Sequence, residues 1–94
     1  MKKFALVCGA SGSIGRAICE ELALDGWSLY VHYNSGLERI QEMALSLSQR
    51  FSAQEFIPVQ ANFAEVDGAE ILASQLFSLQ AVIFANGHAY NQLL

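Results

Sequence analysis

Three glycines that follow a short apolar segment constrain the fold of this chain more than any other feature. Residues 3–15 read KFALVCGASGSIG, so the apolar run Phe4–Val7 leads into glycines at positions 9, 12 and 15. From Ile14 onward, apolar residues recur at helical spacing, which predicts a helix that begins on the turn. The first N–H groups of a helix have no partner inside it, and the helix dipole favours an anion there. Strand, glycine turn and helix together predict a phosphate-binding loop.

The specificity of this pattern depends on its context. Glycines also occur in ordinary strand-to-helix turns, so a structural turn or a mononucleotide site is the alternative to a dinucleotide fingerprint. The position of the glycines after a strand and before a helix favours the dinucleotide fingerprint. The phosphate-loop NTPase pattern is excluded because it ends in Gly-Lys-Ser/Thr, and no lysine follows Lys3.

Composition sets the class of protein. The chain has 94 residues, enough for one small domain, and its 53% hydrophobic and 15% charged residues are typical of a buried sheet. A net charge of −4 gives no general attraction for nucleic acid or anionic membranes, and no apolar run reaches transmembrane length. The short apolar stretch after Lys3 reads as a first strand rather than a signal peptide. We expect Cys8 and Cys19 to be reduced, buried packing residues of a cytoplasmic protein, without a metal.

Predicted strands and helices alternate along the chain. An alternating order implies right-handed crossovers and a parallel sheet. Pro58 cannot donate to a strand ladder, so its strand should lie at a sheet edge, and the expected strand order is 3-2-1-4. We therefore predict an α/β fold, a Rossmann-type parallel sheet flanked by helices, with a ligand crevice between the first and fourth strands. The expected strands are 3–8, 28–33, 55–60 and 81–85, and the expected helices are 13–25, a second beginning after Ser35, and 65–77.

Three local patterns give sharper expectations. Ser35-Gly36-Leu37-Glu38 predicts a capping box, in which Ser35 and Glu38 satisfy each other's free N–H groups. The continuous apolar run 81–85 is typical of a strand covered on both faces, and without an outer neighbour we expect this strand to be an exposed, apolar edge. The residues expected on the buried face of the second helix are Leu37, Ile40, Ala44, Leu47 and Phe51.

The loop Cys8-Gly9-Ala10-Ser11-Gly12-Ser13-Ile14-Gly15 resembles the signature Thr-Gly-x-x-x-Gly-x-Gly of the short-chain dehydrogenase/reductase family. Gly9, Ile14 and Gly15 match, whereas Cys8 replaces the threonine and Ser13 replaces the middle glycine. The same residues also fit Thr-Gly-x-x-Gly-x-x-Gly, the form of the extended branch of the family. Both branches bind nicotinamide dinucleotides. The resemblance implies cofactor contacts from Gly9, Ser11, Gly12, Ser13, Ile14 and Gly15.

The end of the second strand bears on which dinucleotide is bound. An Asp or Glu that binds a free ribose 2′-OH is expected about 20 residues past the glycines, but Tyr33-Asn34-Ser35 holds no carboxylate. Because an acid here would repel a 2′-phosphate, its absence and the neutral groups of Asn34 and Ser35 favour NADP over NAD. These residues can also be a turn and a helix N-cap at the same time. His32 and Arg39 can add positive charge, or be a strand-packing residue and a solvated helix residue.

Two later segments extend the resemblance. The family's Asp-Val after the third strand contacts the adenine, and here Asn62-Phe63 implies a hydrogen bond from Asn62 and packing by Phe63. The alternative is that Asn62 caps the third helix with Glu65 as its partner. The family's Asn-Asn-Ala-Gly after the fourth strand stands here as Phe84-Ala85-Asn86-Gly87, in which only Gly87 matches. The implied backbone contacts to the adenosine ribose come from Ala85, Asn86 and Gly87.

The catalytic residues of the family have no counterpart in this sequence. Hydride transfer in the family uses a serine, a tyrosine as acid/base, and a lysine four residues later that lowers the tyrosine pKa. Here Leu94 stands four residues after Tyr90, and no lysine follows Lys3, so we assign no catalytic residue. Family members are more than twice as long. We expect residues 1–94 to be the dinucleotide-binding, N-terminal half of a truncated doubly wound domain, marginally stable or self-associating when isolated.

Three functions fit these observations. The first is the cofactor half of an NADP-dependent carbonyl reductase similar to the 3-oxoacyl-carrier-protein reductases, a branch that includes reductases of a modified lysine on elongation factor P. It implies a small-molecule or carrier-bound carbonyl substrate and a homo-oligomer for the full-length protein. The second is a non-catalytic NAD(P) sensor, and the third is a fragment without a ligand.

Overall fold

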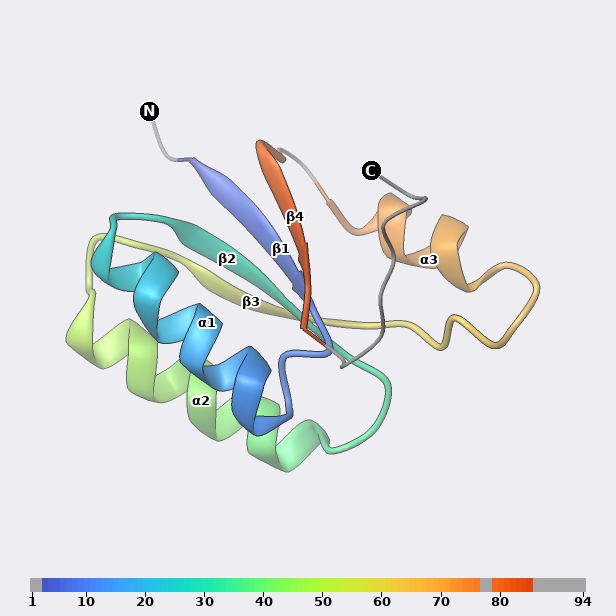
Figure 1. Cartoon of the computed structure of the whole chain (residues 1–94), viewed down its shortest axis with the longest axis horizontal. Coiled ribbons are helices and arrows are strands. Elements are labelled where there is room, and N and C mark those ends of the chain that lie inside the picture. Colours follow the sequence, from blue (N-terminus) through green and yellow to red (C-terminus); the bar gives the residue numbers. More distant parts are fainter. Residues whose placement is uncertain (1–2, 77–78, 86–94) are drawn as a thin grey trace.

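The computed structural model describes residues 3–76 and 79–85 as a parallel sheet with helices on both faces (Figure 1). Its strand order is β3-β2-β1-β4, and each pair of neighbours is parallel, which confirms the predicted Rossmann-type order. Helices α1 and α2 lie side by side on one face, and α3 lies on the other (Figure 1). The elements are β1 (Phe4–Cys8), α1 (Ser13–Leu24), β2 (Ser28–Tyr33), α2 (Leu37–Arg50), β3 (Phe56–Gln60), α3 (Gly68–Ser74) and β4 (Ala81–Phe84).

Strand β1 carries apolar side chains on both of its faces. Alternate residues point to opposite sides of a sheet, so Ala5 and Val7 pack toward α1 and α2, while Leu6 and Cys8 pack on the α3 side. Both cysteines are buried and free, and burial raises the pKa of Cys8 to about 11 and that of Cys19 to about 12. The thiols therefore stay protonated and act as small packing groups, as predicted.

Helix α2 begins differently from the prediction. Gly36 occupies the N-cap position in a left-handed conformation (φ 85°), and no side chain caps this end. The predicted capping box of Ser35 and Glu38 is wrong, because the left-handed turn at Gly36 places Ser35 one residue outside the cap. Leu37 is 45% exposed, so it does not belong to the buried face. The buried residues of α2 are Ile40, Met43, Ala44 and Leu47.

Helix α3 is shorter than the predicted 65–77. Two consecutive turns precede it: the Glu65 N–H donates to the Asn62 carbonyl oxygen at 3.1 Å, and the Gly68 N–H donates to the Glu65 carbonyl oxygen at 3.2 Å. The side chain Oδ1 of Asn62 also accepts a hydrogen bond from the Ala64 N–H at 3.0 Å. These bonds satisfy the backbone in turns, and the helix begins only at Gly68. Phe77, the predicted end, lies outside the described residues.

The sheet ends in β3 on one side and β4 on the other. Pro58 lies on the outer strand β3, as predicted from its missing N–H. Strand β4 forms the other edge, and its apolar residue Val82 is 40% exposed, as expected for this strand without an outer neighbour. Among residues 3–76 and 79–85, no helix combines the length and apolar character that a membrane crossing requires.

Candidate functional site

The turn between β1 and α1 presents an uncapped helix end. Gly9 takes a positive φ of 75°, and the chain then reaches Gly12, the N-cap of α1, in an extended conformation. No side chain hydrogen-bonds to this cap, and the first turn of α1 contains no acidic residue. No carboxylate of the first turn of α1 therefore opposes the helix dipole at this end, which is an electrostatic arrangement that attracts a phosphate.

Two glycines of the turn have different steric roles. A Cβ added at Gly15 would lie 2.7 Å from the Ala10 Cα and closer still to the Gly9 carbonyl oxygen. Helix α1 thus packs backbone against backbone on the turn, and only glycine fits at position 15. A Cβ at Gly12 would meet no atom within 4 Å, so Gly12 faces open space at the helix end.

His32 joins this turn to the neighbouring strands. The Gly9 N–H donates to Nδ1 of His32 at 3.0 Å, and Nε2 lies 2.8 Å from the Ala61 carbonyl oxygen. An N–H can only donate and a carbonyl can only accept, so Nδ1 is bare and Nε2 carries the proton. The ring is buried, and burial lowers its pKa, although the bond to Ala61 opposes the shift. The suggestion that His32 adds positive charge is therefore wrong, and the packing interpretation is right.

Because His32 is buried, we expect the stability of the folded chain to depend on pH. The unfolded chain, with His32 near its ordinary pKa of about 6.5, takes up a proton before the folded chain does. The contribution of His32 to the free energy of unfolding should be level above about pH 6.5 and fall below it by at most about 1.4 kcal/mol per pH unit, until the lower folded-state pKa is passed. Urea melts of the chain and of His32→Asn at several pH values measure this. Identical pH profiles would contradict it.

The end of β2 is exposed where a cofactor ribose is expected. Asn34 and Ser35 are exposed and Tyr33 is half-buried. The Asn34 carbonyl oxygen accepts a hydrogen bond from Gln60 Nε2 at 3.2 Å, which fixes this turn against β3. Arg39 lines a surface hollow together with Glu38 and Glu42, so two acidic residues share this surface with it, which fits the solvated alternative better than a phosphate ligand.

The segment after β3 is built around Asn62 and Phe63. The Asn62 side chain accepts the Ala64 N–H, and its Nδ2 lies 3.5 Å from Glu65 Oε1. Its polar atoms are thus used in a local turn, as in the capping alternative, but the helix begins later. The Phe63 ring is 42% exposed and stacks on the His32 ring, with centroids 4.7 Å apart and planes 19° apart.

The predicted site residues within the described chain lie where the parallel strands end, along what we call the carboxyl edge of the sheet. In a parallel sheet all carboxyl ends share an edge, and each predicted segment lies at or shortly after the carboxyl end of a strand. Ala85 follows β4, is buried, and donates its N–H to the Cys8 carbonyl oxygen at 2.9 Å. Asn86 and Gly87 lie outside the described residues. The edge segments are Gly9–Gly15, Tyr33–Ser35, Asn62–Phe63 and Ala85.

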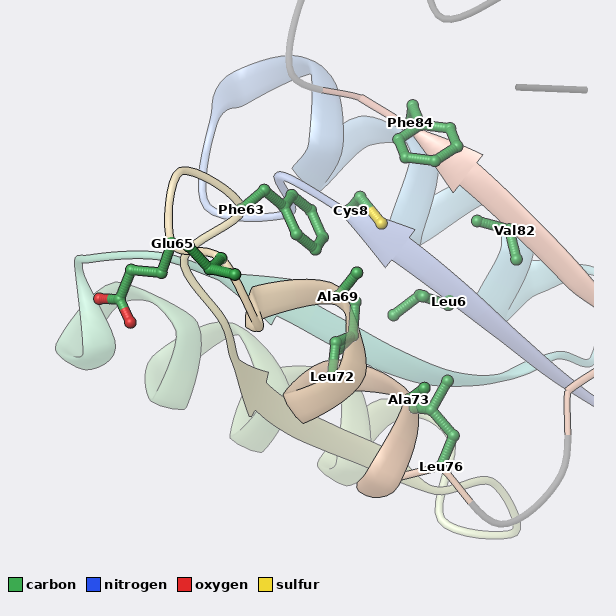
Figure 2. A pocket seen from close by; sticks show the side chains of 11 residues that line it. Leu6, Cys8, Phe63, Glu65, Ala69, Leu72, Ala73, Leu76, Val82 and Phe84 are labelled. Atoms are coloured by element: carbon green, nitrogen blue, oxygen red, sulfur yellow. The ribbon is translucent and has the colours of Figure 1, made fainter. Parts of the chain in front are cut away.

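An apolar cavity of about 440 Å³ lies beside this edge, on the α3 face of the sheet. Figure 2 shows Leu6 and Cys8 of β1, Val82 and Phe84 of β4, and Phe63 around it. α3 closes another side with Ala69, Leu72 and Ala73. In the described part of the chain, no three His, Cys, Asp or Glu side chains come close enough to hold a metal ion.

A parallel sheet of this order, with a glycine turn leading into an uncapped helix, defines the Rossmann type of fold. The short chain dehydrogenase family model matches residues 3–81. The chain belongs to this family, which is a family of oxidoreductases.

Curated relatives support the same family. The chain is 38% identical over 95 residues to the uncharacterized oxidoreductase YmfI of Bacillus subtilis, a match that covers all of this chain and 39% of YmfI. It is 31% identical over 98 residues to the 3-oxoacyl-[acyl-carrier-protein] reductase FabG of Staphylococcus aureus, again covering all of the chain and 39% of the relative. The chain thus spans about two fifths of the length of these relatives.

Solved structures share the fold. The angucycline C-6 ketoreductase LanV, solved with bound NADP, is 35% identical with a TM-score of 0.70, covering 77% of this chain and 27% of LanV. L-Sorbose reductase from Gluconobacter frateurii, solved with NADPH and L-sorbose, is 27% identical with a TM-score of 0.70, covering 79% and 27% of the two chains.

Proposed function

We propose that residues 1–94 are the NADP-binding portion of a short-chain carbonyl reductase, similar to the 3-oxoacyl-[acyl-carrier-protein] reductases. The observation that carries this proposal is the uncapped start of α1, packed through Gly15 directly on the turn that follows β1. The relatives that match the whole chain include reductases of this type.

The residues at the sheet edge fit a dinucleotide. Gly12 faces open space at the positive end of α1, where a pyrophosphate would lie. Ile14 lies at the same end of α1, and its apolar side chain is 61% exposed instead of being packed in the core. The remaining contacts proposed for the cofactor are those of Gly9, Ser11, Ser13, Gly15, Tyr33, Asn34, Ser35, Asn62, Phe63, Ala85, Asn86 and Gly87.

NADP is the proposed dinucleotide because the end of β2 carries no negative charge. Asn34 and Ser35 are exposed and uncharged, so a 2′-phosphate placed against these two residues meets hydrogen-bonding groups where an Asp or Glu would repel it. Two solved relatives in this family hold NADP or NADPH, which supports the same assignment.

Replacing Asn34 with aspartate tests this preference. The added carboxylate should weaken NADPH binding at least about tenfold by like-charge repulsion, and should change NADH binding by less than about threefold. Fluorescence titration of both nucleotides gives the two affinities, with Asn34→Ser as the uncharged control. If the aspartate weakened both nucleotides equally, the 2′-phosphate would not lie at the end of β2.

The chain by itself should bind the cofactor without catalysing the reduction. A bound nicotinamide supplies a hydride, but reduction of a carbonyl also needs a proton donor, and no lysine follows Lys3 to tune a tyrosine for that role. Incubation with NADPH and a 3-oxoacyl thioester should leave the NADPH absorbance unchanged. Steady consumption of NADPH by the purified chain would contradict this part of the proposal.

A further inference from the structure

His32 contacts the loops that follow both neighbouring strands. Strand β2 lies between β1 and β3, so a side chain near its carboxyl end can reach the turn after each of them. On the β1 side, the Gly9 N–H donates to Nδ1 at 3.0 Å, and the Ala10 N–H donates to the His32 carbonyl oxygen at 2.9 Å. On the β3 side, Nε2–H donates to the Ala61 carbonyl oxygen at 2.8 Å.

The contact with Ala61 determines what His32 can offer to Gly9. A neutral imidazole carries one proton, and the nitrogen that bonds to a carbonyl must hold it. Nε2 therefore keeps the proton, and Nδ1 is left as the acceptor for the Gly9 N–H. Since His32 is only 4% exposed, water cannot readily replace this acceptor.

The two loops held by His32 are the two that the proposed function assigns to different parts of the cofactor. Gly9 begins the turn that faces the pyrophosphate, and Ala61 precedes the Asn62-Phe63 segment assigned to the adenine. Phe63 adds a third contact, because its ring stacks on the imidazole at 4.7 Å. One buried side chain thus links both loops.

We propose that His32 is a positioning residue for the dinucleotide: through Nδ1 it holds the Gly9 turn in its binding conformation, and through Ala61 it fixes the tautomer that makes this possible. This inference rests on the proposed function. His32 itself is covered by Phe63 and does not need to touch the cofactor. Its effect on affinity comes from the turn, whose backbone is arranged before the cofactor arrives.

Three substitutions at position 32 separate the hydrogen bond from the packing. In His32→Leu, a side chain of similar bulk leaves the Gly9 N–H without an acceptor. In His32→Asn, Oδ1 stands near the place of Nδ1 and can accept the Gly9 N–H. In His32→Gln, the amide reaches toward Ala61 instead and no acceptor stands at the place of Nδ1.

Ser28→Ala is the matched control. Ser28 lies at the opposite end of β2, is buried, and accepts the Glu55 N–H through Oγ at 2.9 Å. The control thus removes the same kind of bond, from a side chain to a backbone N–H, on the same strand but away from the site.

The experiment measures NADPH affinity by fluorescence, thermal stability, and hydrogen exchange of the Gly9 amide in the chain without cofactor. His32→Leu and His32→Gln should weaken NADPH binding at least about fivefold and expose the Gly9 amide to exchange. His32→Asn should keep the amide protected and bind within about threefold of the original chain. Ser28→Ala should lower the melting temperature and leave NADPH affinity unchanged.

Equal affinities of the Asn and Gln variants would overturn the proposal, as would a Ser28→Ala variant that weakens binding as much as His32→Leu. If the leucine variant does not fold, the Asn and Gln pair alone decides. If the original chain binds no NADPH, the proposed function fails. Exchange of the Gly9 amide then still reports whether His32 holds the turn.

Discussion

Gly15→Ala should destabilise the chain strongly and abolish dinucleotide binding. The new Cβ would lie 2.7 Å from the Ala10 Cα and nearer still to the Gly9 carbonyl oxygen, and both atoms belong to the backbone. Neither can rotate away, so α1 must move off the turn or the turn must open. Overpacking against backbone should cost about 3 kcal/mol of the free energy of unfolding, measured by urea melts. NADPH fluorescence should show no saturable binding.

Gly12→Ala provides the control for that substitution. Its Cβ would meet no atom within 4 Å, and the φ of −82° at Gly12 suits alanine. Its stability should stay within about 1 kcal/mol of the original chain. If Gly15→Ala melted like Gly12→Ala and still bound NADPH, the close packing of α1 on the Gly9 turn would not be what shapes the site.

Gly68→Ala is expected to have the second large effect. Its Cβ would lie 2.8 Å from the Asn62 carbonyl carbon and closer to the carbonyl oxygen, at the point where α3 begins. The substitution must push α3 away from the turn at Asn62 and withdraw Leu72, which is buried on this face of the sheet. We expect a loss of about 2–3 kcal/mol in urea melts.

Gly68→Ala should also disturb the proposed cofactor site at the carboxyl edge of the sheet, because Phe63 belongs to the displaced turn. A moderate weakening of NADPH binding should accompany the loss of stability. Glu70→Ala, an exposed substitution on the same helix, serves as the control. It should change neither the free energy of unfolding nor the free energy of NADPH binding by more than about 0.5 kcal/mol. Unchanged melting of Gly68→Ala would show that the start of α3 does not depend on its contact with Asn62.

The architecture of the sheet was predictable because its determinants are local. The glycine spacing, the alternation of strands and helices and the missing N–H of Pro58 each act within a few residues or follow from general topology. Together they gave the strand order, and β2 was predicted with its observed bounds. The sharing of one edge by the site segments then follows from the parallel arrangement.

The errors arose where one residue type can serve two local structures. Ser35 and Glu38 have the spacing of a capping box, but Gly36 can take a left-handed φ and begins the helix in its place. Asn62 can start a helix or a turn, and its bond to the Ala64 N–H selected the turn. Sequence patterns do not decide between such alternatives, since each is favourable on its own.

The role of His32 was missed for a different reason. Its partners Gly9 and Ala61 lie 23 and 29 residues away in the chain, so the contact exists only once three strands have assembled. The available signal was a histidine in an apolar strand next to the predicted site. Such a side chain, once buried, needs partners for both ring nitrogens.

Titration of the isotope-labelled chain with NADPH, followed by amide NMR spectra, tests whether residues 1–94 hold the dinucleotide at the carboxyl edge of the sheet. We expect saturable shifts concentrated at Gly12–Ile14, at Asn34 and Ser35 and at Phe63, with a weaker response near Asn34 and Ser35 when NADH replaces NADPH. Amides of the distant α1–β2 turn, at Asp25 and Gly26, should not move. Spectra unchanged by NADPH, or shifts centred away from the carboxyl edge of the sheet, would contradict this binding site.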